Sequence, residues 1–190
     1  MQGVLISIQP KWCELIASGK KTVEVRKTKP KLKTPFKVYI YATKQKHYYK
    51  ISDHLLTSDE NLYLSDGKLE MSDCFKFWNS DVAYQLLNRK IIGEFVCDEI
   101  TPLFNVATTS WSLLAGNVHE YAKALVRMAR LTEEEIHSYA KGKNCYAWHI
   151  SDLKIYDKPR ELSEFSKYGF GHPVPLKRPP QSWMYVEVEE

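Results

Sequence analysis

Three ionisable side chains, those of Lys21, Glu24 and Arg26, stand close together near the start of the sequence. Residues 22–27 alternate between apolar and polar side chains, which predicts a half-buried strand. Because strand side chains alternate between two faces, Glu24 and Arg26 share a face, and Lys21 lies at the turn before them. A carboxylate between two cations stays ionised and oriented, which suits acid–base chemistry or the binding of an anion. An exposed ion-pair cluster of little energetic value is the alternative interpretation.

A strand and a short helix precede these residues and must position them. Residues 4–8 form a short apolar run rich in β-branched residues, which predicts a buried strand. Pro10 is typical of the first position of a helix, where its missing N–H costs least. Gly19 predicts the end of that helix, because glycine readily adopts the left-handed conformation found there.

The later chain contains more strand patterns than helix patterns. Strands are predicted over residues 36–43, 90–100, 145–156 and 183–188, with Lys158-Pro159 expected to break the third of them. Thr132 followed by Glu135 predicts a capping box within a helical segment at about 110–141. We expect one α+β domain over residues 1–190, a small mixed β-barrel flanked by short helices, with an insertion at about 44–89.

Charge is distributed unevenly along the chain. The net charge is only +4, but the first fifty residues hold 12 Lys and Arg against two acidic residues. Such asymmetry predicts a side that faces a polyanion. Lys29 and Lys31 belong to a basic, proline-punctuated loop, and as phosphate contacts they would give salt-sensitive affinity. As an alternative, these lysines only keep an exposed loop in solution.

Several classes of function lack their sequence signals. The six histidines and four cysteines show none of the short spacings of a metal site, and no phosphate-binding glycine loop is present. We therefore expect neither a metal nor a cofactor. We also see no signal peptide pattern and no apolar stretch near 18 residues, so we expect a cytoplasmic protein with no membrane partner.

Residues 7–12 (S-I-Q-P-K-W) followed by residues 19–26 (G-K-K-T-V-E-V-R) resemble the ASCH domain, a branch of the PUA-like β-barrel superfamily. Its signature G-x-K-x-x-E-x-R is matched by Gly19, Lys21, Glu24 and Arg26. The resemblance covers most of the chain and implies a PUA-like barrel with a cleft beside the first helix. Relatives place RNA or a modified base in that cleft.

The resemblance implies that this protein binds RNA or a modified nucleoside. Lys21 and Arg26 would hold a phosphate or a base carbonyl, and Glu24 would accept from an exocyclic amine or order the two cations. The expected ligand-binding residues are Ser7, Gln9, Trp12, Gly19, Lys20, Thr22, Arg26, Lys29, Lys31, Gln181, Ser182 and Trp183. Trp148 is interpreted as a core residue, whereas Trp12 and Trp183 suit either the core or base stacking.

Two other classes of function stay open. Some small ASCH proteins hydrolyse N-acylated cytidine with the motif lysine, a strand threonine and a distal glutamate, and others are reported as ribonucleases. Lys21 and Glu24 are then the candidate catalytic residues, although Glu24 stands where the threonine would be and Thr22 lies two residues earlier. Glu94 and residues 133–135 are candidates for the distal glutamate. The third possibility is a protein-interaction module built on the insertion at 44–89.

Overall fold

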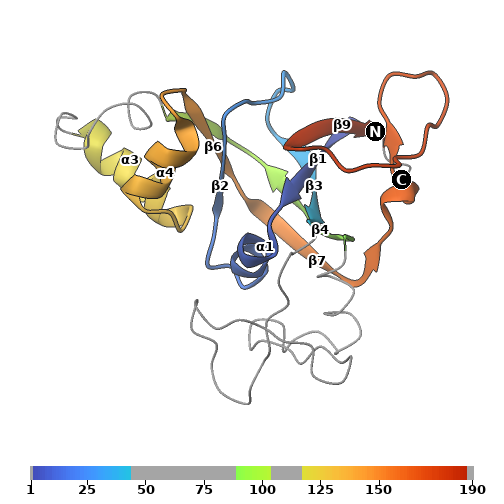
Figure 1. The fold of residues 1–190 in the computed structure, drawn as a ribbon, viewed down its shortest axis with the longest axis horizontal. Helices are drawn as coiled ribbons and strands as arrows, with labels where there is room; N and C mark the ends of the chain where they lie inside the picture. The colour runs from blue at the N-terminus through green and yellow to red at the C-terminus, as the bar shows by residue number, and fades with distance from the viewer. Residues whose placement is uncertain (1, 44–88, 104–116, 188–190) are drawn as a thin grey trace, which may run out of the picture. The chain divides into compact units, whose positions relative to one another are not determined.

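A computed structural model describes residues 2–43, 89–103 and 117–187 of this protein (Figure 1). The predicted insertion at about 44–89 lies almost wholly outside the described residues, as do residues 110–116 of the predicted helical segment. Among the described residues, no helix is long and apolar enough to cross a membrane.

The described chain forms two compact units. The first comprises Met1–Ser18, Val38–Glu94 and Lys154–Glu190, and the second comprises Gly19–Lys37 and Phe95–Leu153. The strands pair into a six-stranded sheet of order β7-β4-β3-β1-β9-β8 and a three-stranded sheet of order β2-β6-β5. The six-stranded sheet consists of β1 (Gln2–Ile8), β3 (Phe36–Ala42), β4 (Ile91–Cys97), β7 (Ser151–Arg160), β8 (Ser166–Lys167) and β9 (Trp183–Glu187).

Strand β1 lies in the middle of the first unit. It pairs in parallel with β3, where Ile6 faces Ile40, and antiparallel with β9, where Ile6 faces Trp183 (Figure 1). A cluster of buried apolar residues in this unit includes Leu5 and Phe165, which are both fully buried. Helix α1 (Pro10–Ala17) follows β1 with proline in its first turn, as the sequence predicts, and the 3-10 turn η3 is Leu162–Glu164.

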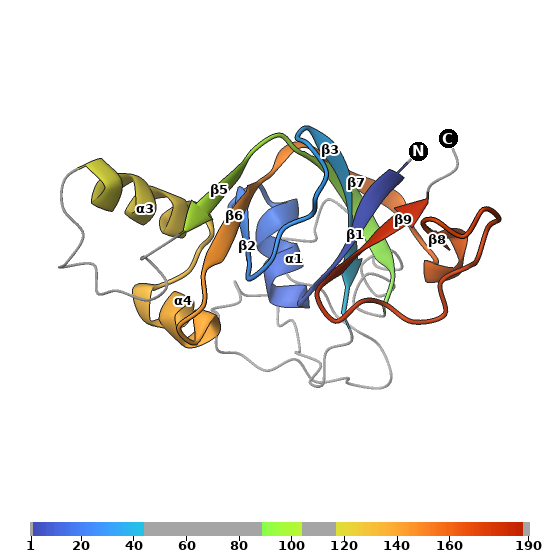
Figure 2. The same ribbon diagram turned by 90° about the horizontal axis from the view of Figure 1, so that it is seen from above.

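The second unit places two helices beside the three-stranded sheet of β2 (Val23–Arg26), β5 (Ile100–Leu103) and β6 (Cys145–His149). Figure 2 shows these helices, α3 (Asn117–Met128) and α4 (Glu133–Ala140), next to β5 and β6. Buried apolar residues from both helices and all three strands form one core. The capping box at the start of α4 is confirmed, because Thr132 Oγ1 accepts from the Glu135 N–H at 3.1 Å.

Two predicted strands prove to be broken, because the chain changes sheets in each of them. Residues 90–100 contain the whole of β4 and the first residue of β5, separated by the exposed pair Asp98 and Glu99. Residues 145–156 are divided between β6 and β7, with Ile150 between them. The expected break at Lys158-Pro159 is wrong. Strand β7 runs on to Arg160 because it is an edge strand, where a proline removes no hydrogen bond that a neighbour needs.

The α+β class is confirmed, with mixed sheets and short helices. Among the described residues the strands form two sheets and no closed barrel. Strand β4 requires a glycine for close packing, since a Cβ on Gly93 would lie 2.5 Å from the backbone oxygen of Lys154 on β7. The prediction of one domain over the whole chain stays a prediction.

Candidate functional site: a buried ion network at strand β2

The backbone around Lys21 is fixed from both sides. The Thr22 N–H donates to the Met128 oxygen at the end of α3 (3.1 Å), and the Thr22 oxygen accepts from the Ile150 N–H (3.0 Å). Strand β2 then pairs with β6, and Glu24 faces Trp148 in the register. Val23 and Val25 belong to the core that contains α3 and α4, so the alternation of the strand places Glu24 and Arg26 on its other face.

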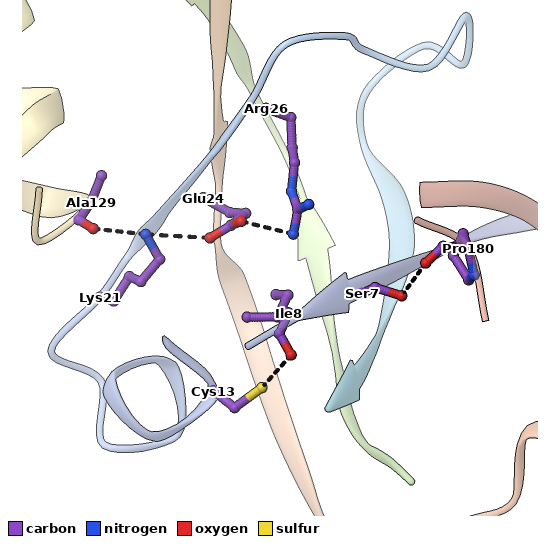
Figure 3. A network of polar contacts seen from close by, with 8 residues as sticks. All are labelled: Ser7, Ile8, Cys13, Lys21, Glu24, Arg26, Ala129 and Pro180. Carbon is purple, nitrogen blue, oxygen red and sulfur yellow. Dashed lines mark hydrogen bonds and ion pairs between the residues drawn. The ribbon is translucent and has the colours of Figure 1, made fainter. Parts of the chain in front are cut away.

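The motif residues form one continuous network, which Figure 3 shows from close by. Glu24 Oε1 lies 2.9 Å from Arg26 Nη2, and Glu24 Oε2 lies 3.3 Å from Lys21 Nζ. Lys21 Nζ also donates to the main-chain oxygen of Ala129 at 2.7 Å. The exposed fractions of Lys21, Glu24 and Arg26 are 2, 6 and 9%. The predicted grouping is therefore confirmed, and the alternative of an exposed ion-pair cluster is wrong.

Burial dominates the electrostatics of this network. Desolvation lowers the pKa of the Lys21 ammonium, against the opposing effect of the Glu24 carboxylate, and Arg26 lowers it further. Lys21 therefore releases its proton more readily than an exposed lysine. Its two nearby acceptors nevertheless hold the charged form in place, so the arrangement suits both an oriented cation and a proton-transferring group.

Two aromatic residues lie near strand β2, Trp148 on the neighbouring strand β6 and Tyr139 on helix α4. Trp148 is fully buried, as predicted for a core residue, and the ring of Phe36 meets it edge-on at 6.1 Å between centroids. On α4, the Tyr139 hydroxyl is hydrogen-bonded to the Lys27 backbone. Burial raises the pKa of Tyr139, and the charge of Arg26 lowers it. The charge of the network therefore affects the titration of this hydroxyl.

The other predicted residues of this unit lie around the network rather than within it. Gly19 is exposed with a φ of +70°, so it occupies the left-handed region expected after a helix. Lys20 is exposed, and its backbone oxygen accepts from Arg130 Nε at 2.5 Å. Lys29 and Lys31 are exposed in the loop after β2. These exposed positions lie outside the buried network.

The remaining predicted residues belong to the first unit and gather near the end of β1. Ser7 Oγ donates to the Pro180 oxygen at 2.6 Å, which Figure 3 shows, and the Ser7 N–H donates to the Ser182 oxygen at 2.9 Å. Gln181 is exposed beside them, and Trp183 is half-buried with its ring 5.4 Å from that of Tyr185. Two segments from opposite ends of the described chain thus meet at Ser7.

The helix that follows β1 contributes two more predicted residues. Gln9 is exposed at the N-cap of α1, and its side chain makes no capping hydrogen bond. Trp12 is half-buried, with the Lys11 ammonium 4.3 Å from its ring centroid. The part of these residues in ligand binding stays a prediction, as does the cleft beside the first helix.

The candidates for a distal glutamate have different partners. Glu94 Oε2 accepts from the Tyr156 hydroxyl at 2.5 Å, and Glu133 lies 3.7 Å from His137 Nε2. Glu135 accepts from the Thr132 N–H at 2.8 Å, and its charge acts to raise the pKa of Lys21 against the larger effect of burial. Glu135 is therefore the candidate that is electrostatically coupled to the network. Within the described ranges, no group of three or more His, Cys, Asp or Glu side chains is placed to hold a metal ion.

Sequence reasoning missed two members of this neighbourhood. The Ala129 oxygen is a main-chain acceptor far along the chain from Lys21, and nothing in the residue type signals it. Tyr139 gives a weak signal only, as an aromatic residue on the helix that begins at the capping box. Its place beside Lys27 depends on how α4 packs.

Comparison with known proteins identifies the family. The model of the ASCH domain matches residues 6–160. A crystal structure of a serine-to-alanine mutant of the ASCH protein of Zymomonas mobilis is similar in fold, with a TM-score of 0.54 and 20% identity over 97% of this chain and 88% of that one. A second crystal structure of the Zymomonas mobilis protein has a TM-score of 0.49 and 19% identity, over 97% of this chain and 87% of that one. No curated protein matches the sequence significantly. This chain belongs to the ASCH domain family.

Proposed function

We propose that this protein binds RNA through the basic segment that follows strand β2. The chain leaves the buried network at Arg26 and enters a loop in which Lys29, Lys31 and Lys33 are all exposed. Exposed lysines can contact the phosphates of a polynucleotide and release the counterions bound to them. The membership of the ASCH family, whose proposed role is RNA binding, supports the same conclusion.

The observation that carries the proposal is an anchored strand joined directly to an exposed basic segment. The network ties Arg26 to Glu24 at 2.9 Å, so the start of the segment is fixed. Pro30 is buried between Lys29 and Lys31, so the segment is also anchored at its middle. Cations on a fixed backbone lose less conformational freedom on binding than cations on a free tail.

The motif residues have a supporting part in this proposal. Lys21, Glu24 and Arg26 hold the strand that presents the lysines, and they are buried in the structure described above. The same proposal has a second part. In it, Lys21 or Arg26 contacts a phosphate or a base carbonyl directly, and Glu24 accepts from an exocyclic amine.

The test measures RNA affinity as a function of salt. A short RNA of mixed sequence is titrated with the wild type and with a Lys29→Ala, Lys31→Ala, Lys33→Ala triple variant. Three lost phosphate contacts reduce the slope of log affinity against log salt by about 2 for a single strand. The matched control removes three exposed lysines of the first unit, Lys154, Lys158 and Lys177, and leaves the slope nearly unchanged. Absence of RNA binding by the wild type, or equal slopes for the two triple variants, refutes the proposal.

Hydrolysis is a second candidate, and the lowered pKa of Lys21 favours it. A lysine with a lowered pKa can accept a proton from a reacting water or attack a carbonyl itself. The wild type and Lys21→Ala are incubated with acylated nucleosides and short RNAs, and products are measured by mass spectrometry. Turnover that disappears in a folded Lys21→Ala protein supports an amidohydrolase or ribonuclease. No turnover by the wild type removes this candidate.

A further inference from the structure

We propose that a hollow beside helix α4 is a base-stacking subsite for single-stranded RNA, with the ring of Tyr139 as its platform. This inference rests on the proposed RNA-binding function and says where one base is held. The hollow has a volume of about 510 Å³. That size is ample for one nucleobase and is within the usual range of small-molecule sites. Its lining residues are Lys27, Glu134, Glu135, Ser138, Tyr139 and Lys141.

The Tyr139 ring is accessible, and its present neighbour can be displaced. The residue is 39% exposed, and the Lys27 ammonium lies 4.9 Å from the ring centroid. A cation over an exposed ring binds more weakly than a stacked base does. The flexible Lys27 side chain can therefore give way to a base and turn its ammonium toward a neighbouring phosphate.

The charges in the hollow favour a base over a phosphate group. Lys27 and Lys141 contribute two ammonium groups, and Glu134 and Glu135 contribute two carboxylates. Glu135 accepts from the Thr132 N–H in the capping box, and the side chains of both glutamates are exposed. A carboxylate repels phosphate but accepts from the exocyclic amine of a base. The hollow thus offers one aromatic face, two carboxylates that can accept, and two cations for the flanking backbone.

A second pair of a lysine and an aromatic ring lies two residues further along the basic segment. Lys29 Nζ lies 5.6 Å from the ring centroid of Tyr146, which faces Arg26 in the pairing of β2 with β6. Two lysines at alternate positions, each beside an aromatic ring, repeat the combination of stacking and charge that single-strand binders use. The Lys27 backbone is fixed by its hydrogen bond to the Tyr139 hydroxyl, so the first pair has a defined geometry.

The test compares tyrosine variants on one RNA. A fluorescently labelled RNA of about ten nucleotides, and an abasic RNA of the same length, are titrated with the wild type, Tyr139→Ala and Tyr139→Phe. Loss of a stacked base weakens binding of the ordinary RNA by about 5- to 100-fold in Tyr139→Ala. Tyr139→Phe keeps the ring and loses the hydrogen bond between its hydroxyl and the Lys27 backbone, so its binding weakens less than that of Tyr139→Ala. Tyr121→Ala is the matched control, because Tyr121 is a tyrosine exposed on α3 to 51%.

Two readouts separate stacking from electrostatics. Tyr139→Ala leaves the salt slope unchanged, because no phosphate contact is lost. The abasic RNA binds Tyr139→Ala and the wild type equally, because it has no base to stack. If Tyr139→Ala does not fold, Tyr139→Leu replaces it, since leucine fills space without an aromatic face.

The outcomes distinguish the two proposals. Weakened binding by the alanine or leucine variant, seen only with the RNA that carries bases, supports the subsite. Wild-type affinity in a folded variant overturns the subsite and leaves the RNA-binding function standing. No RNA binding by the wild type overturns both.

Discussion

Replacing Glu24 by glutamine removes the negative charge that lies between two buried cations. The wild-type carboxylate contacts Arg26 Nη2 at 2.9 Å and Lys21 Nζ at 3.3 Å, and its side chain is 8% exposed. Glutamine has nearly the same shape, so the packing is kept and the charge alone is lost. Lys21 and Arg26 are then two like charges in a poorly solvated place.

The expected loss of unfolding free energy is large and depends on pH. Removing one partner of a buried ion pair costs about 3–5 kcal/mol, and we expect about 4 kcal/mol near pH 7 because two contacts are affected. Lys21 limits this loss, since it can release its proton instead of remaining charged beside Arg26. Relative to the ordinary lysine pKa of 10.5, that release costs about 5 kcal/mol near pH 7 but only about 2 kcal/mol near pH 9. The loss therefore falls to about 2 kcal/mol near pH 9.

Urea unfolding of the wild type and Glu24→Gln at both pH values measures these losses. The control is Glu120→Gln, which removes a 71% exposed carboxylate 3.6 Å from Lys123 and is expected to cost less than about 1 kcal/mol. A loss below about 1 kcal/mol in Glu24→Gln would show that water solvates the network. A loss that is the same at both pH values would refute the part assigned to Lys21.

Three further changes test the fold. Gly93→Ala places a Cβ 2.5 Å from the Lys154 oxygen and is expected to lower the unfolding free energy by about 1–3 kcal/mol in urea, and an unchanged unfolding free energy would contradict the close packing of β4 on β7. Thr132→Ala removes the N-cap of α4 and should lower the melting temperature, at a cost of about 1 kcal/mol, and an unchanged melting temperature would contradict the capping box. Burial raises the pKa of Tyr39 to about 12, so the folded state keeps this proton above pH 10 and its stability falls as the pH rises from 10 to 12. Tyr39→Phe should lessen that fall in alkaline unfolding curves, and curves that stay parallel would rule the assignment out.

Local patterns in the sequence predict local structure well here. Pro10 and Thr132 mark the starts of α1 and α4, because both act through neighbouring backbone groups. The alternation over residues 22–27 correctly places Glu24 and Arg26 on one face, because the period of a strand is fixed by its pleat.

Features that depend on distant backbone were not predictable. The sequence suggests neither the burial of Lys21 nor its acceptor, because the Ala129 oxygen reaches it from the end of α3, and any residue type carries such an oxygen. The continuation of β7 through Pro159 depends on its position at the sheet edge, which is a property of the whole sheet. The hollow beside Tyr139 likewise exists only once α4 is packed.

The pairing of β1 with β9 affects how this protein folds while it is being synthesised on the ribosome. Residues 2–8 are translated well before one of their two partner strands, Trp183–Glu187, which is the last strand of the described chain. Until that strand emerges, one edge of an apolar segment has no native hydrogen-bonding partner. Contacts between residues so far apart in the sequence form slowly, and the unpaired edge of β1 is a site for aggregation until they form. Chaperones that bind nascent chains are therefore expected to act on strand β1.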